Sequence, residues 1–270
     1  MKTSRFLTLF RTAFLAVVLA GCSGRAPGNF QGYIEGEYVY VASPLGGALA
    51  HLAVARGDSV KAGQLLFELE RQSEAAMLDQ ADKNLTQAKA TQELAESMYQ
   101  RRKELRDSPS PTVSAEELDK ARADRDTAAA QVASLSAAWD KAKWSFDQKQ
   151  QAAPTNAFVQ DTLYRQGEWV APGNPVIALL PPENLKVRFF VPQEILPKIK
   201  TGATVNVTFD GGAKTYSGTV NYISAQAEFT PPVIYNRENR SKLVYMIEAR
   251  FSPADAPDLR PGQPVDVKLP

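Results

Sequence analysis

The only cysteine of the chain, Cys22, stands where a lipid could be attached. It follows directly after the apolar run Phe14–Ala20, which Lys2, Arg5 and Arg11 precede. Basic residues before a short apolar run are typical of a secretory signal peptide, and this run is too short to span a membrane as a mature helix. It ends in L-A-G-C, the pattern of a lipobox, whose cysteine becomes the acylated first residue after cleavage. We therefore expect a lipoprotein signal peptide over residues 1–21 and a stable lipid anchor on Cys22.

The remaining candidates for chemistry are weak. The sole histidine, His51, lies between the apolar Leu49 and Leu52 on a predicted strand, where a structural or surface role outweighs a catalytic or metal-binding one. The sequence has no Cys/His cluster for zinc and no G-x-S-x-G nucleophile pattern. Its many carboxylates recur at helical spacing, which is typical of solvated helix faces. We therefore expect no enzyme activity, no cofactor and no metal site.

The composition indicates an exported, folded protein. Hydrophobic residues make up 44% and charged residues 23%, and no second apolar run is long enough to cross a bilayer. Of the 31 basic residues three lie in residues 1–21, so that the remainder has a formal net charge of −2. This balance gives no electrostatic reason to expect a nucleic acid partner. The length permits one or two compact domains.

Residues 73–150 form the element around which the chain is organised, because they carry two heptad patterns of near-equal length. In each, one row of residues recurs at alternating steps of three and four, the spacing of a coiled-coil seam. The first seam comprises Leu78, Ala81, Leu85, Ala88, Gln92, Ala95, Tyr99 and Arg102. The second comprises Leu118, Ala121, Arg125, Ala128, Val132, Leu135, Trp139, Ala142 and Phe146.

The chain must turn between these helices, since Pro109 and Pro111 cannot continue a helix. Ser114 and Glu117 form an S-x-x-E capping box, which satisfies free N–H groups where the second helix begins. A short turn between matched helices predicts an antiparallel hairpin. Each arm would be about 50 Å long at 1.5 Å per residue. Part of an ordinary helical bundle would need further long amphipathic helices, and the sequence shows none.

The segments on either side of the hairpin repeat one pattern, displaced by a constant 110 residues. The first copy contains Pro44, Leu49, Gly57, Asp58, Val60, Gly63, Leu66, Phe67 and Leu69. These align without gaps with Pro154, Val159, Gly167, Glu168, Val170, Gly173, Val176, Ile177 and Leu179. Each copy has the pattern of a strand, a tight turn and a second strand. Neither copy could bury its apolar face alone, so we expect a small two-fold β-sandwich with the hairpin projecting from the crossover.

The stretches A-S-P-L-G-G-A-L, R-G-D-S-V-K-A-G-Q-L-L and R-Q-G-E-W-V-A-P-G-N-P-V resemble the two halves of a biotinyl/lipoyl domain. A lipoyl domain split by a helical hairpin resembles the HlyD/AcrA-type periplasmic adaptors, or membrane fusion proteins, of Gram-negative exporters. The resemblance covers nearly all of the chain after the leader. True lipoyl domains carry their modified lysine on the turn between the halves, where this chain runs from Leu69 into helix. Lys61 belongs to an earlier turn and is expected on the solvated surface.

The hairpin turn resembles that of AcrA-like adaptors, which have an Arg, a Leu four residues later, and a Ser that opens the second helix. Arg101, Leu105 and Ser114 match this pattern, although the spacing from Leu to Ser is two residues longer, around S-P-S-P. The resemblance implies that this tip docks on a TolC-like outer-membrane channel. The presence of a serine at position 114 would also be explained by a role as the cap of the second helix.

Alternating stretches after Pro181 and Pro182 predict a small antiparallel barrel, with a glycine turn at Asp210–Gly212 and a short helix over Gln193–Lys198. The predicted strands are Leu185–Val191, Val205–Phe209, Tyr216–Ile223, Leu243–Phe251 and Val265–Leu269. The runs A-E-F-T-P-P-V-I-Y-N-R-E-N-R-S-K-L-V-Y and L-R-P-G-Q-P-V-D-V resemble the barrel of the YbhG-like branch of these adaptors. Adaptors for RND pumps usually continue beyond this barrel, so the resemblance favours an ABC-type exporter as partner.

The predicted fold is mainly β with an inserted α-helical coiled-coil hairpin. The expected parts are a signal peptide (1–21), a tether (22–29), the first lipoyl half with a leading strand (30–71), the hairpin (72–151), the second lipoyl half (152–182) and a β-barrel (183–270).

The resemblance implies a lipid-anchored adaptor in the periplasm that joins an inner-membrane transporter to a TolC-like channel. It would act as a ring, taken as a hexamer, with its anchor in the inner membrane. Two alternatives stay open. A biotin/lipoyl-type carrier protein would need the absent lysine turn, and a structural coiled-coil lipoprotein would leave the repeat and the barrel unexplained.

Overall fold

The computed structural model describes residues 29–110, 112–209, 214–229 and 243–269. The described residues form two compact units, one of residues 38–181 and one that combines residues 29–37 with the described residues from 182 onward. The predicted signal peptide, Cys22 and the turn at Asp210–Gly212 lie outside the described residues. In the described part of the chain, no helix is both long and apolar enough to cross a membrane.

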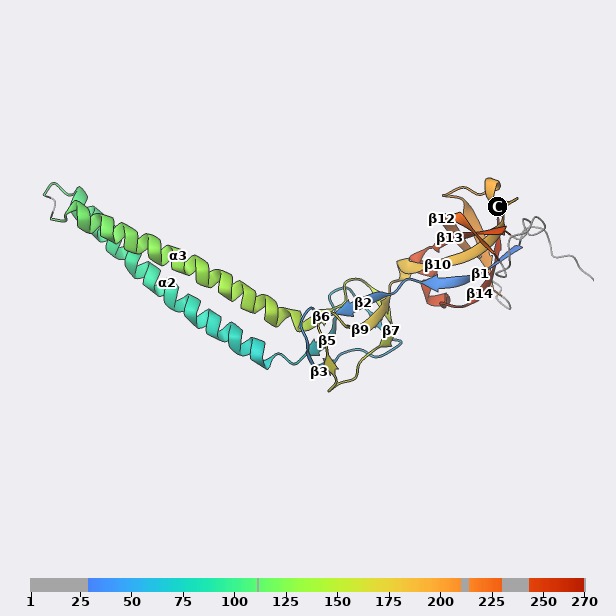
Figure 1. The fold of residues 1–270 in the computed structure, drawn as a ribbon, viewed down its shortest axis with the longest axis horizontal. Helices are drawn as coiled ribbons and strands as arrows, with labels where there is room; N and C mark the ends of the chain where they lie inside the picture. The colour runs from blue at the N-terminus through green and yellow to red at the C-terminus, as the bar shows by residue number, and fades with distance from the viewer. Residues whose placement is uncertain (1–28, 111, 210–213, 230–242, 270) are drawn as a thin grey trace, which may run out of the picture. The chain divides into compact units, whose positions relative to one another are not determined.

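The unit of residues 38–181 contains the helical hairpin and a β-sandwich. Its elements are β2 (Val39–Ala42), β3 (Gly47–Leu52), β4 (Ser59–Val60), β5 (Leu65–Leu69), α2 (Gln72–Asp107), α3 (Ala115–Gln148), β6 (Gln150–Ala152), β7 (Ala157–Thr162), β8 (Trp169–Val170) and β9 (Pro175–Leu180). The strands form two four-stranded sheets, in the orders β2-β9-β7-β4 and β6-β5-β3-β8. The helices α2 and α3 run side by side along their length (Figure 1).

The sandwich is built by the repeat. Each half gives a strand to the other, since β3 pairs with β8 and β4 pairs with β7. The hydrogen bonds repeat with the same displacement: the N–H of Gly57 donates to the carbonyl of Val159, and the N–H of Gly167 donates to that of Leu49, both at 2.8 Å. Gly57 and Gly167 both have a positive φ, 94° and 92°, which glycine adopts without steric cost.

The core of the sandwich contains the aligned apolar residues of both halves. Its buried members are Val41, Leu49, Val54, Val60, Leu66, Phe67, Leu69, Ala153, Ala157, Val159, Val170, Val176, Ile177 and Leu179. The predicted two-fold lipoyl-like sandwich with an inserted hairpin is therefore confirmed.

The second unit is a closed six-stranded barrel. Its strands are β1 (Asn29–Gly36), β10 (Leu185–Pro192), β11 (Thr204–Thr208), β12 (Tyr216–Phe229), β13 (Leu243–Phe251) and β14 (Pro264–Lys268), with short 3-10 turns η2 (Pro182–Asn184), η3 (Leu196–Lys198) and η5 (Pro253–Asp258). They close in the order β1-β10-β13-β12-β11-β14. Inward-facing residues such as Ile34, Val187, Phe189 and Ile247 are fully buried. The predicted barrel is confirmed, and only the last part of the predicted short helix over residues 193–198 is helical, as η3.

The position of the leading strand, β1, differs from the sequence prediction, which placed it with the first lipoyl half. β1 pairs instead with β10 on one side and β14 on the other, and so closes the barrel. Gly32 lies so close to β10 that an added Cβ would clash with the backbone of Arg188 and the side chain of Phe189. The barrel therefore takes its strands from both ends of the described chain.

Candidate functional site: the helical hairpin

The hairpin is held together by the two predicted seams. Every residue of either seam is buried or partly buried, with Leu85, Ala88 and Tyr99 of α2 and Ala121 and Ala128 of α3 buried most deeply. Most seam residues are alanine or leucine, so the helices pack at a short distance along their length. The antiparallel coiled-coil hairpin is confirmed.

One polar contact interrupts the seam toward the tip. The guanidinium of Arg125 lies 4.3 Å from the centroid of the Tyr99 ring and 3.9 Å from the carboxylate of Glu96. Its hydrogen bond with Asp126 is the main reason why the pKa of Arg125 is raised. The side chain thus keeps its charge while its stem and planar head cover Tyr99.

At its base, the hairpin is tied to the sandwich by a buried lysine. Lys149, which ends α3, is only 5% exposed, and its Nζ donates to the carbonyl oxygens of Gly46 at 2.7 Å and Glu70 at 3.2 Å. The same Nζ lies 3.0 Å from a carboxylate oxygen of Glu74 on α2. The other oxygen of Glu74 is buried without a hydrogen-bond partner among the described residues. One side chain therefore joins both helices to the loop before β3.

A second cation, at the start of α2, contacts the end of α3 and the neighbouring strands. Arg71, just before α2, lies 4.3 Å from the centroid of the Phe146 ring on α3. It also pairs with Glu68 of β5 at 2.8 Å and donates to the side chain of Gln150 in β6 at 3.2 Å. These two cations fix both helix ends on neighbouring strands of one sheet.

The tip carries the three residues predicted for docking. Arg101 and Leu105 are exposed and lie one helical turn apart on α2, with Leu105 43% exposed. Ser114 caps α3: its Oγ accepts from the N–H of Glu117 at 3.2 Å, and a Glu117 carboxylate oxygen accepts from the N–H of Ser114 at 2.8 Å. These bonds from Ser114 hold the pKa of the Glu117 carboxyl below its usual value.

One residue that stabilises the turn, Arg106, was not identified from the sequence. Arg106 donates from Nη1 to the carbonyl of Val113 at 2.9 Å and so closes the turn between the helices. Ser108 adds a bond from its Oγ to the carbonyl of Leu105 at 2.8 Å. The predicted docking residues Arg101 and Leu105 thus lie on a helix end that the turn itself holds in place.

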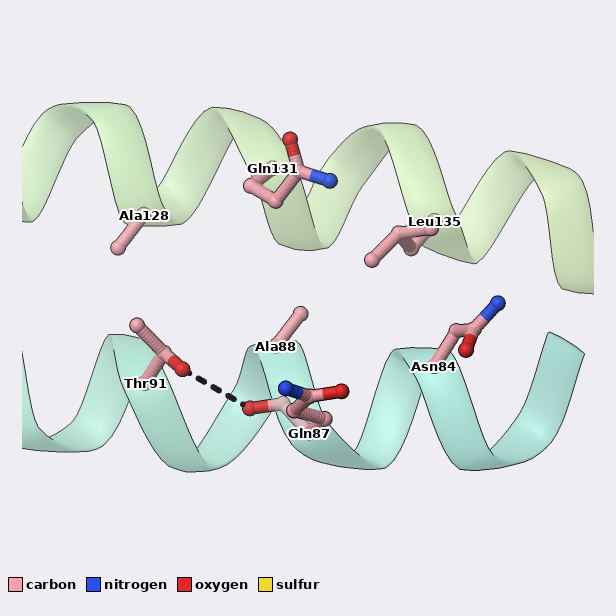
Figure 2. Close-up of a pocket in the computed structure, with 7 residues that line it drawn as sticks. All are labelled: Asn84, Gln87, Ala88, Thr91, Ala128, Gln131 and Leu135. Carbon is pink, nitrogen blue, oxygen red and sulfur yellow. Dashed lines mark hydrogen bonds between the residues drawn. The ribbon is translucent and has the colours of Figure 1, made fainter.

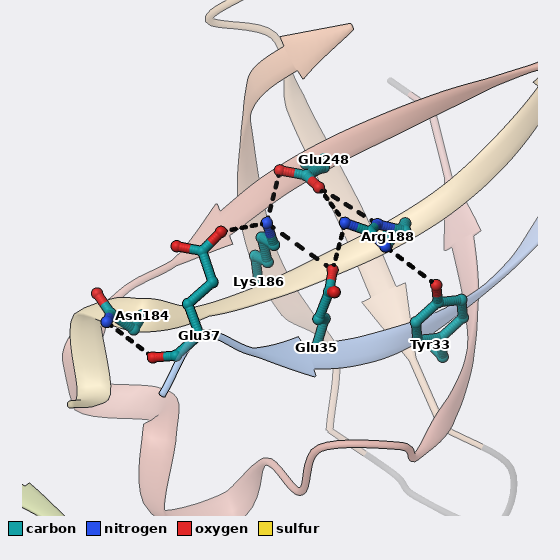
Figure 3. A network of polar contacts seen from close by, with 7 residues as sticks. All are labelled: Tyr33, Glu35, Glu37, Asn184, Lys186, Arg188 and Glu248. Atoms are coloured by element: carbon teal, nitrogen blue, oxygen red, sulfur yellow. Dashed lines mark hydrogen bonds and ion pairs between the residues drawn. The ribbon is translucent and has the colours of Figure 1, made fainter. Parts of the chain in front are cut away.

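A network of charged side chains links three strands of the barrel (Figure 3), and its central members Lys186 and Glu248 are buried. Lys186 Nζ lies 2.8 Å from Glu248 and 2.5 Å from Glu37, while Arg188 lies 2.8 Å from both Glu248 and Glu35. The network therefore joins β1, β10 and β13, the strands that supply Glu35, the two cations and Glu248.

Burial and pairing act in opposite directions on these groups. Burial alone raises the pKa of the Glu248 carboxyl, but the hydrogen bonds from Lys186 and Arg188 outweigh it and leave that pKa lowered. Burial likewise lowers the pKa of Lys186, and its bonds to Glu248 and Glu37 outweigh this and leave it raised. Lys186, Arg188 and Glu248 therefore stay ionised at neutral pH and link β1, β10 and β13.

The other candidates for chemistry are found apart from one another. His51 is exposed on β3, and Lys61 is exposed in the turn before β5. The part of the chain that the structure describes contains no group of His, Cys, Asp and Glu side chains suited to a metal ion. Between the lipoyl halves, β5 is followed directly by Glu70, Arg71 and α2, so a modified lysine has no turn there.

Comparison with known proteins confirms the predicted resemblance. Residues 77–149 match the family model described as the RND membrane fusion protein alpha-helical hairpin domain. The UPF0194 membrane protein YbhG of Salmonella gallinarum is 28% identical in an alignment 331 positions long, which covers 100% of this chain and 98% of the relative. YbhG of Salmonella typhi aligns over the same shares at the same identity.

Solved structures share the fold. The membrane fusion protein Spr0693 from Streptococcus pneumoniae R6 has a TM-score of 0.65 at 20% identity, covering 90% of this chain and 98% of that one. A MacA-MexA chimeric protein containing the Pseudomonas aeruginosa MexA alpha-hairpin domain has a TM-score of 0.62 at 21% identity, covering 91% and 83%. At these identities the likeness concerns the fold alone.

Proposed function

We propose that this chain, a relative of the membrane fusion proteins or periplasmic adaptors of efflux systems, bridges an inner-membrane transporter and a TolC-like outer-membrane channel without catalysing a reaction. The observation that carries this proposal is the hairpin. Its α2 arm has 36 residues, about 54 Å at 1.5 Å per residue, and ends in an exposed tip. An element of that length contributes little to the core of the sandwich and is suited to contact another molecule at a distance.

The fixed base of the hairpin supports the same role. Lys149 and Arg71 join both helices to the sandwich, so that a contact made at the tip is transmitted to the sandwich instead of bending the hairpin at its base. Leu105 leaves 43% of its surface in water at the tip, where an apolar side chain gains from a partner.

The membrane attachment in this proposal is the lipid anchor on Cys22, which would hold the protein in the periplasm on the inner membrane. Acyl chains on one cysteine bind a membrane stably when more than one is present. The sequence pattern around Cys22 supports the anchor, since the apolar run ends directly before it.

We propose that the transporter is of the ABC type. The adaptor is proposed to act as a ring of six copies. The ABC assignment rests on the resemblance noted in the sequence, whereas the family model that matches the hairpin is described for RND systems. Affinity purification of the anchored protein from solubilised membranes distinguishes the two. Recovery of an ATPase and its permease supports the proposal, and recovery of an RND pump contradicts the ABC assignment.

The bridging role is tested at the tip by Arg101→Asp combined with Leu105→Asp. Both residues are exposed, and exposed substitutions usually change stability by within about 0.5 kcal/mol. We therefore expect an unchanged melting temperature, loss of crosslinks to the outer-membrane channel, and loss of export.

Ser114→Ala is the matched control, since it removes the cap of α3 and should cost about 1 kcal/mol. Reduced stability with export retained would separate its capping role from docking. Normal export by the double variant would refute the bridging role.

A further inference from the structure

Of the large hydrophobic residues that the structure describes, Trp169 is the most exposed, with 70% of its surface in water. It stands on β8, an edge strand of its sheet, directly after the turn of residues 165–168. Burying a large aromatic side chain normally stabilises a protein, and this one forgoes that free energy. Packing within the chain therefore does not account for the tryptophan.

The fold does not require a tryptophan at this place, as the internal repeat shows. Ser59 occupies the equivalent position in the first half and is paired with β7. In both turns a carboxylate accepts from the backbone N–H three residues earlier, Asp58 at 2.7 Å and Glu168 at 2.8 Å. Because the same turn forms before a serine, the indole of Trp169 is free to serve another purpose.

The residues around the indole are too small to cover it. Trp169 lies opposite Ala48 of β3 on the outer face of the sheet, since Val170, the next residue, is buried in the core. Two positions away on either side along the chain are Gly167 and Ala171. A ligand can therefore lie against the ring without displacing a side chain.

On the far side of Ala48 the same face carries a carboxylate. The N–H of Glu70 donates to the carbonyl of Ala48 at 2.8 Å, and Leu69 before it lies in the core, so Glu70 faces outward. One of its carboxylate oxygens accepts from the N–H of Gln72 at 2.8 Å. Two strand spacings, roughly 10 Å, separate Glu70 from Trp169.

The cations that flank these residues in the chain do not occupy this face. Arg71, next to Glu70, is paired with Glu68 at 2.8 Å. Arg165 begins the turn before β8, and the cation–ring contacts within the described residues involve other aromatic side chains than Trp169. The indole and the Glu70 charge therefore both remain available to a cation from outside the chain.

The equivalent face of the other sheet is filled. Its three corresponding positions hold Ser59, Phe158 and Leu180, which neighbour one another by strand pairing. A large ring thus stands at the centre, and Leu180, which takes the place of the carboxylate, is only 4% exposed. The combination of an open indole, an alanine and a carboxylate belongs to one half alone and is not a consequence of the repeat.

The hollow along the hairpin is chemically different (Figure 2). It has a volume of about 350 Å³ and is lined by small and uncharged side chains, among them Ala88, Ala128 and Gln131. It presents neither an aromatic ring nor a charge to a ligand. A cation has no reason to prefer this hollow to water.

We propose that the face formed by Trp169, Ala48 and Glu70 binds organic cations that carry a flat apolar group. Tryptophan attracts a cation placed over its ring more strongly than the other aromatic side chains do. The carboxylate of Glu70 adds an opposite charge, and Ala48 lets a flat molecule lie close to the sheet. This binding is separate from the bridging role and does not depend on it.

The test is fluorine NMR of the full-length protein in a neutral detergent, with fluorotryptophan in place of tryptophan. The chain has three tryptophans, and single Trp→Phe variants assign their resonances. The probe is N-methylquinolinium, a flat permanent cation. We expect it to shift the Trp169 resonance saturably and to leave those of Trp139 and Trp144 unchanged. Trp144 is the internal control for unspecific stacking, because half of its surface is exposed.

Quinoline and quinoline carboxylate are the matched probes, since they have nearly the same shape but are neutral and anionic at neutral pH. We expect the cation to bind about two- to fivefold more tightly than quinoline, the size of a cation–π contribution at an exposed site. Glu70→Gln should weaken binding of the cation and not of quinoline, because only the cation is attracted by the lost charge. Arg165→Gln should not weaken binding of the cation.

Trp169→Ser should abolish binding of the cation in equilibrium dialysis while the melting temperature stays unchanged, since Ser59 fits the same turn. The proposal would be overturned by an equal shift of the Trp144 resonance, by equal affinity for quinoline, or by tighter binding of the carboxylate. A Trp169 resonance that ignores the cation and responds only to another membrane protein would also overturn it. These measurements do not involve export, so their outcome leaves the test of the bridging role independent.

Discussion

Lys149→Met should destabilise the unit of residues 38–181 more than any exposed substitution in the hairpin. The change removes the donor to the carbonyls of Gly46 and Glu70 and leaves the Glu74 carboxylate without its cation. Breaking a buried ion pair by removing one partner costs about 3–5 kcal/mol. The Glu74 side chain is 19% exposed and so keeps some contact with water, which places our expectation near the lower end, about 3 kcal/mol.

The assay is urea or thermal unfolding followed by tryptophan fluorescence. All three tryptophans of the chain, Trp139, Trp144 and Trp169, lie in the unit of residues 38–181, so the signal reports that unit and not the barrel. For a unit of this size, a loss of about 3 kcal/mol lowers the melting temperature by roughly 6–12 °C.

The paired variant separates the ion pair from the packing of the lysine stem. Lys149→Met combined with Glu74→Met removes both charges, and replacing a buried pair by apolar side chains is often close to neutral. We expect the double variant to be more stable than Lys149→Met alone. A single variant within about 0.5 kcal/mol of the unsubstituted chain, or a double variant no better than the single one, would refute the role given to Lys149.

Three further outcomes are expected. Cys22→Ser should move the protein from the membrane to the soluble periplasmic fraction and abolish fatty-acid labelling; continued labelling would contradict the anchor. Replacing residues 73–148 by a short Gly/Ser linker should leave a folded sandwich by circular dichroism but no export, since β5 and β6 pair directly beside the excision and the new loop is short. The barrel should lose stability in acid: the pKa of Glu248 is lowered, so its contribution is complete above the usual value near 4.3 and disappears as the pH falls through the lowered pKa. Hydrogen exchange of β13 at decreasing pH measures this loss, and Glu248→Gln should remove the pH dependence.

The parts of the fold that depend on local sequence were predictable. The seams follow from heptad spacing, and residues such as Leu85 and Ala128 are buried as their positions in the pattern require. The sandwich follows from the repeat, since Leu49 and Val159 occupy equivalent places and are both buried. The cap formed by Ser114 and Glu117 was equally local.

Contacts between distant residues were not predictable. β1 has the alternation of a strand, but its partners β10 and β14 lie some 150 or more residues further along the chain, and nothing in its own sequence selects them. In the sequence, Lys149 and Arg71 resemble the charged residues of any solvated helix end. Only the fold brings Lys149 to buried carbonyl oxygens and Arg71 to an aromatic ring. The same holds for Lys186 and Glu248, which pair across β10 and β13.

The insertion of both helices between β5 and β6 also bears on how such a protein can change in size. Because the hairpin begins and ends on paired strands, removing or adding seven residues in α2 together with seven at the same height in α3 preserves both seams and both cations at the base. Each such step changes the reach by about 10 Å, at 1.5 Å per residue, and leaves the same faces turned outward. The length of the hairpin can therefore vary between related proteins in discrete steps, while the sandwich that supports the hairpin stays as it is.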